Sequence, residues 1–265
     1  MTRRLCLVTG ASAGIGAAFA RVYASHGYDV FLTARRLERL ETLAAEIRLH
    51  HGVEAFVVAA DLSEPGAVDK VLAAVAAEGR DVDALVNNAG YGLPGAFANT
   101  SWADQQAFLQ VMAVAMAEFA HKVLPGMVER KFGRIVNVAS LAGITPGSAG
   151  HTLYGAVKSL IIKFSQSLHM ETAGQWVHVT ALCPGFSYSE FHDVNGTRET
   201  TNQMPGWLWL GADEVAATGY EAAEANRAVS VPGAPNKAIA ALAKILPDDW
   251  ALALMASQSS RFRKL

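Results

Sequence analysis

Short apolar runs rich in Val, Ile and Leu alternate along the chain with longer segments in which apolar residues recur at helical spacing. This alternation is typical of βαβ units, which build a parallel sheet covered by helices. We expect strands at residues 4–9, 29–33, 54–59, 84–87, 134–138, 177–182 and 229–231. The helical segments between them are residues 14–26, 36–50, 64–78, 102–130, 152–172 and 212–224.

No break in composition interrupts this pattern, so we expect one α/β domain over residues 1–265, with a seven-stranded parallel sheet and helices on both faces. Residues 186–210 depart from the alternation and contain His192 and two tryptophans. We expect these residues to form a substrate lid, and the alternative is a surface loop whose tryptophans pack into the core. The C-terminal extension, residues 236–265, is expected to be a helix packed on a neighbouring subunit or a frayed end, rather than a membrane-surface helix.

Composition narrows the function classes. The 265 residues are 51% hydrophobic and 17% charged, which excludes a largely disordered chain. Lys and Arg number 22 against 24 Asp and Glu, a net charge of −2, so no basic surplus favours a nucleic-acid partner. Cys6 and Cys183 lie in apolar runs and are expected to be buried reduced thiols, which suits the cytoplasm. We expect no membrane span, no secretory leader and no metal site.

Three glycines follow the first expected strand, in the segment Thr9-Gly10-Ala11-Ser12-Ala13-Gly14-Ile15-Gly16. In such a turn Gly10 permits a sharp bend, Gly14 lets the backbone approach a pyrophosphate, and Gly16 lets the next helix pack closely on the strand. The helix N-terminus then offers unpaired N–H groups and a partial positive charge to phosphates. A glycine turn between a strand and a helix predicts the dinucleotide site of a doubly wound Rossmann domain.

The second expected strand runs into Arg35 and Arg36, at the place where an acidic residue would bind the ribose 2′-hydroxyl of NAD. No acid stands there. The guanidinium of Arg35 instead suits a 2′-phosphate, so NADP(H) is favoured over NAD(H). The alternative is that both arginines are only the solvated first turn of a helix.

Tyr154 and Lys158 are four residues apart on an expected helix, which places them on one face, one turn from each other. A neighbouring ammonium favours the phenolate, so Lys158 is expected to lower the pKa of Tyr154 and make it a better acid or base. Ser140 ends the preceding strand, where open α/β sheets bind ligands, and its hydroxyl can hydrogen-bond a carbonyl as charge develops on it. A Tyr and a Lys at this spacing often occur by chance. The order of a glycine turn, then Ser140 and then this pair is much more specific.

With these motifs the chain resembles the short-chain dehydrogenase/reductase family over nearly its whole length. The glycine turn is similar to the family's cofactor motif, and Asn87-Asn88-Ala89-Gly90 to its fourth-strand motif. Ser140, Tyr154 and Lys158 match its catalytic residues. Within the family, the chain looks most like the NADP-dependent bacterial carbonyl reductases.

The resemblance also implies contacts with the cofactor. Asp61 and Leu62 would flank the adenine, Asn88 would lie beside the adenosine ribose, and Ser187 would meet the nicotinamide carboxamide. Ser189 stands where the family commonly has threonine. The whole implied cofactor-binding set is Gly10, Ser12, Gly14, Ile15, Gly16, Arg35, Asp61, Leu62, Asn88, Tyr154, Lys158, Pro184, Gly185 and Ser187.

One position departs from the family pattern. The family usually has an asparagine, thought to hold a water beside the lysine, at the position that Met112 occupies here. A thioether is at most a weak acceptor and donates nothing. Met112 is therefore a tolerated variation with another proton route, or the mark of a slow or lost activity.

The sequence thus predicts an NADP(H)-dependent oxidoreductase that transfers a hydride between nicotinamide and a carbonyl or alcohol substrate, with an apolar substrate favoured. The alternative is an NADP(H)-binding sensor or scaffold with weak or no catalysis. The resemblance implies a homodimer or homotetramer, which the small residues at 113–120 and 150–156 in the long helices would permit.

Overall fold

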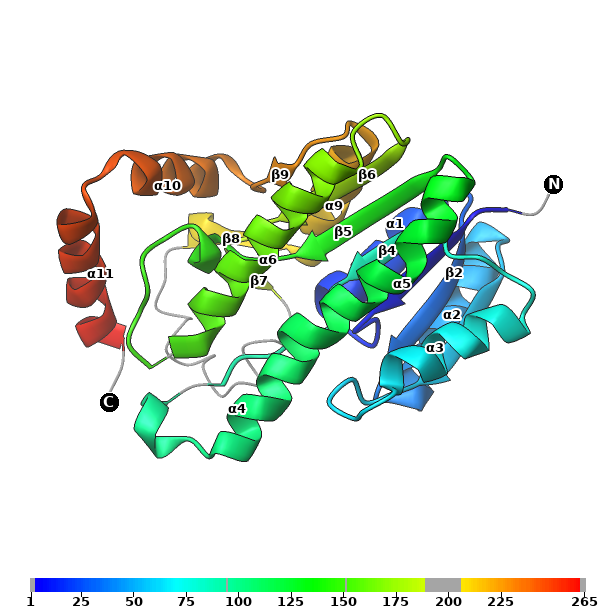
Figure 1. Ribbon diagram of the computed structural model, residues 1–265, viewed down its shortest axis with the longest axis horizontal. Helices are drawn as coiled ribbons and strands as arrows, with labels where there is room; N and C mark the ends of the chain where they lie inside the picture. The colour runs from blue at the N-terminus through cyan, green and yellow to red at the C-terminus, as the bar shows by residue number, and fades with distance from the viewer. Residues whose placement is uncertain (1–2, 94, 151, 189–205, 263–265) are drawn as a thin grey trace.

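The computed structural model describes the backbone of residues 3–93, 95–150, 152–188 and 206–262 (Figure 1). Its main sheet has seven strands, all parallel, in the order β3-β2-β1-β4-β5-β6-β9. The predicted sheet is confirmed, and the predicted strand ends differ from the observed ones by at most one residue. The strands are β1 (Leu5–Thr9), β2 (Asp29–Ala34), β3 (Ala55–Ala59), β4 (Ala84–Asn87), β5 (Gly133–Val138), β6 (Val177–Leu182) and β9 (Val229–Ser230).

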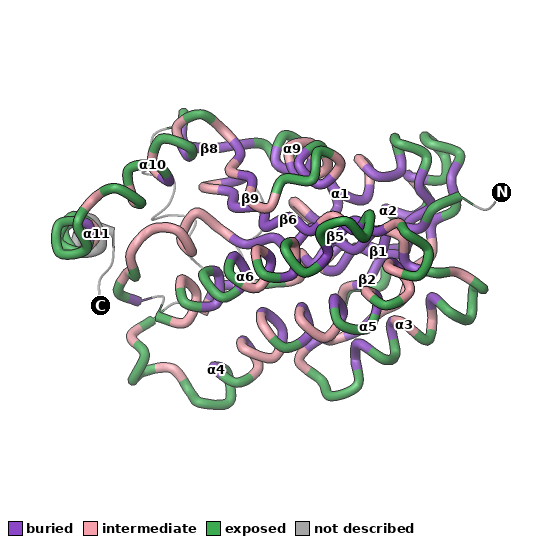
Figure 2. Tube along the Cα trace, turned by 45° about the horizontal axis from the view of Figure 1, so that its top comes forward, coloured by how far each residue is buried: buried purple, intermediate pink, exposed green. Residues whose placement is uncertain are grey.

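Helices cover both faces of this sheet. On one face lie α1 (Gly14–Ser25), α2 (Leu37–His51) and α9 (Ala212–Glu224), which share a core cluster with β1 and β2. On the other lie α3 (Ala67–Ala77), α5 (Ala115–Glu129) and α6 (Thr152–Glu171). Figure 2 shows the strands buried and the outer helix surfaces exposed. The strands read as continuous apolar runs because both of their faces are covered.

The order of the strands reverses between β1 and β4. From β1 the chain moves outward through β2 to β3, and it then returns to place β4 on the other side of β1. The connections that follow β1 and β4 therefore diverge, and this topology predicts a crevice at the carboxyl ends of these two strands. Crevices at such a switch point are where open α/β sheets bind ligands.

The helix predicted over residues 102–130 is interrupted. Its first part is α4 (Trp102–Leu109), its last part is α5, and between them Gln110–Val114 form a π-helical turn. A π turn accommodates one more residue than an α turn, so the faces of α4 and α5 are out of phase. Within it Met112 is 2% exposed and packs on the backbone of Gly90, where a Cβ would lie 2.6 Å from its Sδ.

The start predicted for the third helix at residue 64 is wrong, because α3 begins at Ala67. Pro65 and Gly66 precede this start and are unfavourable in a helix. Gly66 has a φ of 77°, a left-handed conformation outside the helical range.

The helical run Trp102–Glu129 is long and apolar enough to cross a membrane by length and composition, and it is the one such helix among the described residues. Phe119 and Ala120 of this run are fully buried in the core cluster under β1, β4 and β5. Such apolar length is also typical of the core helix of a globular domain.

The segment predicted as a lid begins and ends in a small parallel ribbon of β7 (Phe186–Tyr188) and β8 (Trp209–Gly211). Ser189 and His192 lie outside the described residues. Trp209 is buried and stacks on Tyr188 with 4.8 Å between ring centroids, whereas Trp207 is 66% exposed.

The C-terminal extension forms α10 (Ala234–Ile245) and α11 (Asp248–Phe262), beyond the carboxyl ends of the strands (Figure 1).

Candidate active site

The glycine turn lies at the switch point and is held there by the end of β4. Thr9 Oγ1 accepts hydrogen bonds from the backbone N–H groups of Asn88 and Ala89, both at 3.0 Å. In return, the Asn88 amide donates to the carbonyls of Thr9 and Gly10 at 3.0 and 3.2 Å. Asn88, expected beside a ribose, therefore also joins the two strands on which the turn is built.

The turn leaves room at its surface only because its key positions lack side chains. Gly10 and Gly14 have φ values of 66° and 55°, which favour glycine. A Cβ on Gly16 would lie 2.3 Å from the carbonyl oxygen of Gly10. Helix α1 then starts at Gly14 without a side-chain cap from Ala13, so the first-turn N–H groups are not capped by that side chain. This cradle fits a pyrophosphate.

Two arginines stand beside the turn. Arg36 reaches back to Ser12, with Nε and Nη2 at 3.3 and 3.0 Å from its Oγ. Arg36 precedes α2 rather than lying in it. Arg35 is exposed. Burial raises the pKa of Tyr91, and the charge of Arg35 reduces that rise. The sequence assigned only Arg35 to the cofactor, but the contact with Ser12 makes Arg36 a second candidate beside the glycine turn.

The carboxylate of Asp61 completes this end of the crevice. Its Oδ1 accepts hydrogen bonds from the N–H and hydroxyl of Ser63 at 3.0 and 2.7 Å. These bonds, and then the charge of Arg35, lower the pKa of Asp61. Leu62, which is expected to flank the adenine with Asp61, is buried and lines a small cavity.

Ser140 and Tyr154 come together at the other end of the crevice. Ser140 lies two residues beyond the end of β5 and caps the next turn, because its Oγ accepts the Ala142 N–H at 3.1 Å. Burial raises the pKa of Tyr154 to about 12, and a side-chain hydrogen bond with Ser140 opposes that effect. The expected lowering of the Tyr154 pKa is therefore wrong, because burial raises this pKa and the group that opposes the rise is Ser140 rather than Lys158.

Lys158 lies one turn further along α6 and is 6% exposed. Its Nζ donates to the carbonyl of Val138 at 2.7 Å and lies 5.6 Å from the centroid of the Tyr154 ring. Burial lowers its pKa to about 8. At neutral pH Lys158 is still an ammonium, so the phenol of Tyr154 has a buried positive charge as its neighbour.

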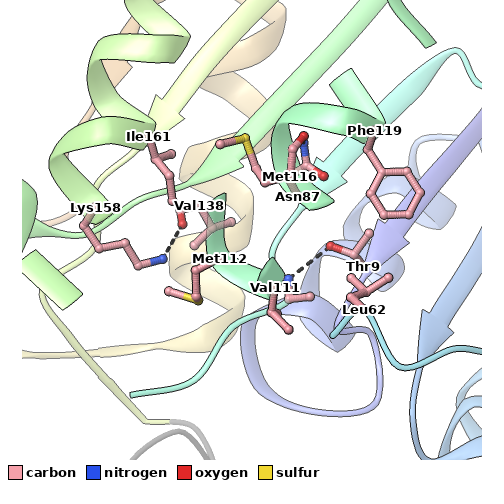
Figure 3. Close-up of a pocket in the computed structure, with 11 residues that line it drawn as sticks. Thr9, Leu62, Asn87, Val111, Met112, Met116, Phe119, Val138, Lys158 and Ile161 are labelled. Carbon is pink, nitrogen blue, oxygen red and sulfur yellow. Dashed lines mark hydrogen bonds between the residues drawn. The ribbon is translucent and has the colours of Figure 1, made fainter. Parts of the chain in front are cut away.

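A small cavity lies beneath this lysine (Figure 3). Its volume is about 10 Å³, which is room for about one water. Met112 and Lys158 both line this cavity, so the residue that departs from the family pattern lies in the same wall as the lysine expected to be catalytic (Figure 3). The thioether gives that wall no hydrogen-bond donor.

A buried polar network connects the strands to α6. The Asn87 amide donates to Asn137 Oδ1 at 2.9 Å, and the Asn137 amide donates to Ser165 Oγ at 2.9 Å. Asn137 and Ser165 are fully buried. Asn137 adjoins Val138, the acceptor for Lys158, and Ser165 follows Lys158 by two helical turns. Sequence reasoning missed both residues, and the signal was a polar side chain inside the apolar run Ile135-Val136-Asn137-Val138.

The end of β6 closes the crevice. The Pro184 carbonyl accepts the Leu141 N–H at 2.8 Å, which fixes it beside the Ser140 segment. Gly185 follows, and Ser187 is 7% exposed in β7. The structure thus brings the glycine turn, Arg35, Asp61, Ser140, Tyr154, Lys158, Pro184 and Gly185 to one edge of the sheet.

Lys158 makes the stability of the fold depend on pH. Its pKa is about 8 in the folded protein against 10.5 for a free side chain, so between these values the unfolded chain holds the extra proton. The free energy of unfolding therefore rises with pH across this window. Lys158→Met should remove roughly 1–3 kcal/mol of that rise, measured by denaturant unfolding. The same pH dependence in both proteins would contradict a destabilised ammonium.

Comparisons with known proteins identify relatives for most of the chain. The family model of the short chain dehydrogenases matches residues 4–199. Serine 3-dehydrogenase of Agrobacterium fabrum is 35% identical over 85% of this chain and 90% of its own length. The NADP-dependent 3-hydroxy acid dehydrogenase YdfG of Salmonella typhi is 35% identical over 82% of this chain and 81% of its own.

The fold has solved counterparts. A 7β-hydroxysteroid dehydrogenase superposes with a TM-score of 0.85, at 28% identity, over 95% of this chain and 96% of the other. The doubly wound fold and the family resemblance are both confirmed. Because the family model covers most of its length and relatives exceed 30% identity, the chain belongs to the short chain dehydrogenase family.

Proposed function

We propose that this enzyme is an NADP(H)-dependent oxidoreductase that interconverts a carbonyl group and an alcohol. The observation that carries the proposal is the convergence of Ser140, Tyr154 and Lys158 at the carboxyl edge of the sheet, across the crevice from the glycine turn. The names of a relative and of a solved structure, which contain NADP and NADPH, support the same cofactor.

The residues on the adenine side fit NADP(H). The uncapped first turn of α1 and the glycine turn suit the pyrophosphate. Arg35 and Arg36 offer two guanidinium groups to a 2′-phosphate. The hydrogen bonds from Arg36 to Ser12 hold one of these groups beside the glycine turn. The chemistry that the dinucleotide brings when bound is the two-electron reduction of a carbonyl carbon.

On the reacting side, each residue handles the substrate oxygen or its proton. With a pKa raised to about 12, Tyr154 is a neutral phenol at physiological pH and holds the proton that a carbonyl oxygen needs. The Ser140 hydroxyl donates a hydrogen bond to the same oxygen as negative charge develops there. The Lys158 ammonium stabilises the phenolate that remains on Tyr154 after the proton has moved.

Removing the proton of Tyr154 should stop the reaction and leave the cofactor site intact. We expect Tyr154→Phe to lose about 10²-fold or more in NADPH consumption with ketones, aldehydes and quinones as the substrate panel. NADPH affinity, measured by tryptophan fluorescence, should stay unchanged. Tyr220→Phe, on the far α9 helix, is the matched control. Unchanged turnover in Tyr154→Phe would overturn the assignment.

The choice between NADPH and NADH rests on the two arginines. We expect Arg36→Ala to weaken NADPH binding by about tenfold to a hundredfold, the loss of a charge-assisted contact, and to leave NADH binding unchanged. Arg39→Ala, in the first turn of α2 and likewise exposed, removes the same charge and serves as the control. Equal losses for NADPH and NADH in Arg36→Ala would contradict a 2′-phosphate contact.

For the substrate we propose an apolar or aromatic carbonyl compound. Support comes from the aromatic side chains where the proposed lid begins and ends. The ring centroids of Phe186 and Trp209 lie 5.6 Å apart, and Trp207, two residues earlier in the chain than Trp209, is exposed. Leu93 adds a half-buried apolar side chain after β4. Pro94, expected beside it, lies outside the described residues.

A second candidate function is a sensor or scaffold that binds NADP(H) with little catalysis. The observation in its favour is Met112, which puts a thioether in the cavity wall beside Lys158. Met112→Asn should raise turnover by about tenfold if the thioether interrupts a proton route, since general acid–base catalysis is worth this much or more. NADPH binding by both proteins with turnover in neither would favour the sensor. Equal, measurable turnover would show that protons take another route.

We propose that the chain forms a homodimer or homotetramer in the cytoplasm. Large apolar side chains exposed on the helices support assembly, among them Val114 at the end of the π turn and Leu160 on α6. Ile245 of α10 and Trp250 of α11 are 78% and 69% exposed, so the C-terminal extension also carries exposed apolar side chains. The location is supported by the two cysteines, which are free and buried.

A further inference from the structure

The C-terminal extension reaches the active-site edge through one buried side chain. Asn236 lies in the first turn of α10 and is 2% exposed. A Cβ on Gly185, just beyond β6, would lie 2.3 Å from Asn236 Oδ1, 2.7 Å from its Cγ and 2.8 Å from its Nδ2. The Asn236 amide therefore packs against the Cα of Gly185, and only glycine fits opposite it.

This amide is fixed in place from its own side. Asn236 Nδ2 donates to the Pro232 carbonyl at 3.0 Å, which joins the start of α10 to the loop after β9. Gly233 has a φ of 80°, and a Cβ there would lie 3.4 Å from the same nitrogen. The amide is confined between Gly185 and this loop. Burying an amide is costly unless it is hydrogen-bonded, and an apolar side chain would fill the space without that requirement.

Pro184 and Gly185, which we call the β6 turn, are held from two sides. On the inner side the Pro184 carbonyl accepts the Leu141 N–H at 2.8 Å, one residue after Ser140. On the outer side stands Asn236. The β6 turn thus connects the catalytic segment with an element that begins beyond residue 199, where the match to the family model ends.

The position of the β6 turn shows which end of the cofactor it borders. The glycine turn and Arg36 lie over β1 and β2, so they receive the adenine side. Ser140 and Tyr154 lie over β5 and α6, on the other side of the switch point. β6 is the next strand beyond β5, so its carboxyl end borders the nicotinamide half.

We infer that Asn236 is a positioning residue, which fixes the β6 turn against the nicotinamide half of the cofactor. The C-terminal extension thereby contributes to cofactor affinity without touching the cofactor. This inference rests on the proposed function, since it requires that NADP(H) occupies the crevice.

Two ligands separate this role from a general structural one. NADPH has a nicotinamide, and 2′-phospho-ADP-ribose has the same adenine, phosphates and ribose without it. By titration calorimetry, we expect Asn236→Ala to weaken NADPH binding by about fivefold to tenfold, because a preorganised wall is lost. Its affinity for 2′-phospho-ADP-ribose should match that of the wild type. Lys237→Ala, the next residue and exposed on α10, should change neither affinity.

Gly185→Ala perturbs the same contact from the other side and keeps the test open if Asn236→Ala folds poorly. Alone, it should weaken NADPH binding selectively, because its methyl group collides with the Asn236 amide. Added to Asn236→Ala, it should cost much less, since the amide that it collides with is gone.

Several results would overturn the inference. Equal losses for both ligands would show a role in the fold as a whole, and unchanged NADPH affinity in Asn236→Ala would show no role at all. Additive losses in the double variant would show that the contact is not the cause. A wild-type protein that binds neither ligand would instead overturn the proposed function, and this inference with it.

Discussion

The hydrogen bonds between Thr9 and Asn88 are the constraint on which the rest of the site depends. They join the ends of β1 and β4 across the place where the strand order reverses, and they also set the shape of the glycine turn. Without these bonds, only loops would fix the ends of β1 and β4 relative to each other. With the strand ends fixed, the adenine side and the reacting side keep a defined separation, which a dinucleotide must span.

The reacting side is held by burial rather than by exposed loops. Lys158 and the network of Asn87, Asn137 and Ser165 place charge and amide groups inside an apolar layer, where each requires a partner. These groups attach α6 to β4 and β5 at two levels along the helix. Tyr154 therefore stands on a helix whose height above the sheet is set by hydrogen bonds as well as by packing.

The sequence was sufficient for the sheet, because parallel strands buried on both faces have unmistakable apolar runs and glycine turns have a fixed place between strand and helix. It was insufficient where a side chain acts across long sequence separation. Asn137 meets Ser165, and Asn236 meets Gly185, only after folding. Nor does local pattern distinguish a π turn from an α turn, since Gln110–Val114 are ordinary helix-forming residues. The pKa of Tyr154 was misjudged because burial is a tertiary property.

The π turn at Gln110–Val114 also determines how α4 and α5 are phased. An α-helix advances about 100° per residue, so the additional residue turns everything before it by that angle relative to everything after it. Deleting one residue here would restore a regular helix and rotate α4. Phe108 would then lose its edge-to-face contact with Tyr91. The length of this segment is therefore under tighter constraint than its composition, and relatives that differ here in length should differ in the wall they present to the crevice.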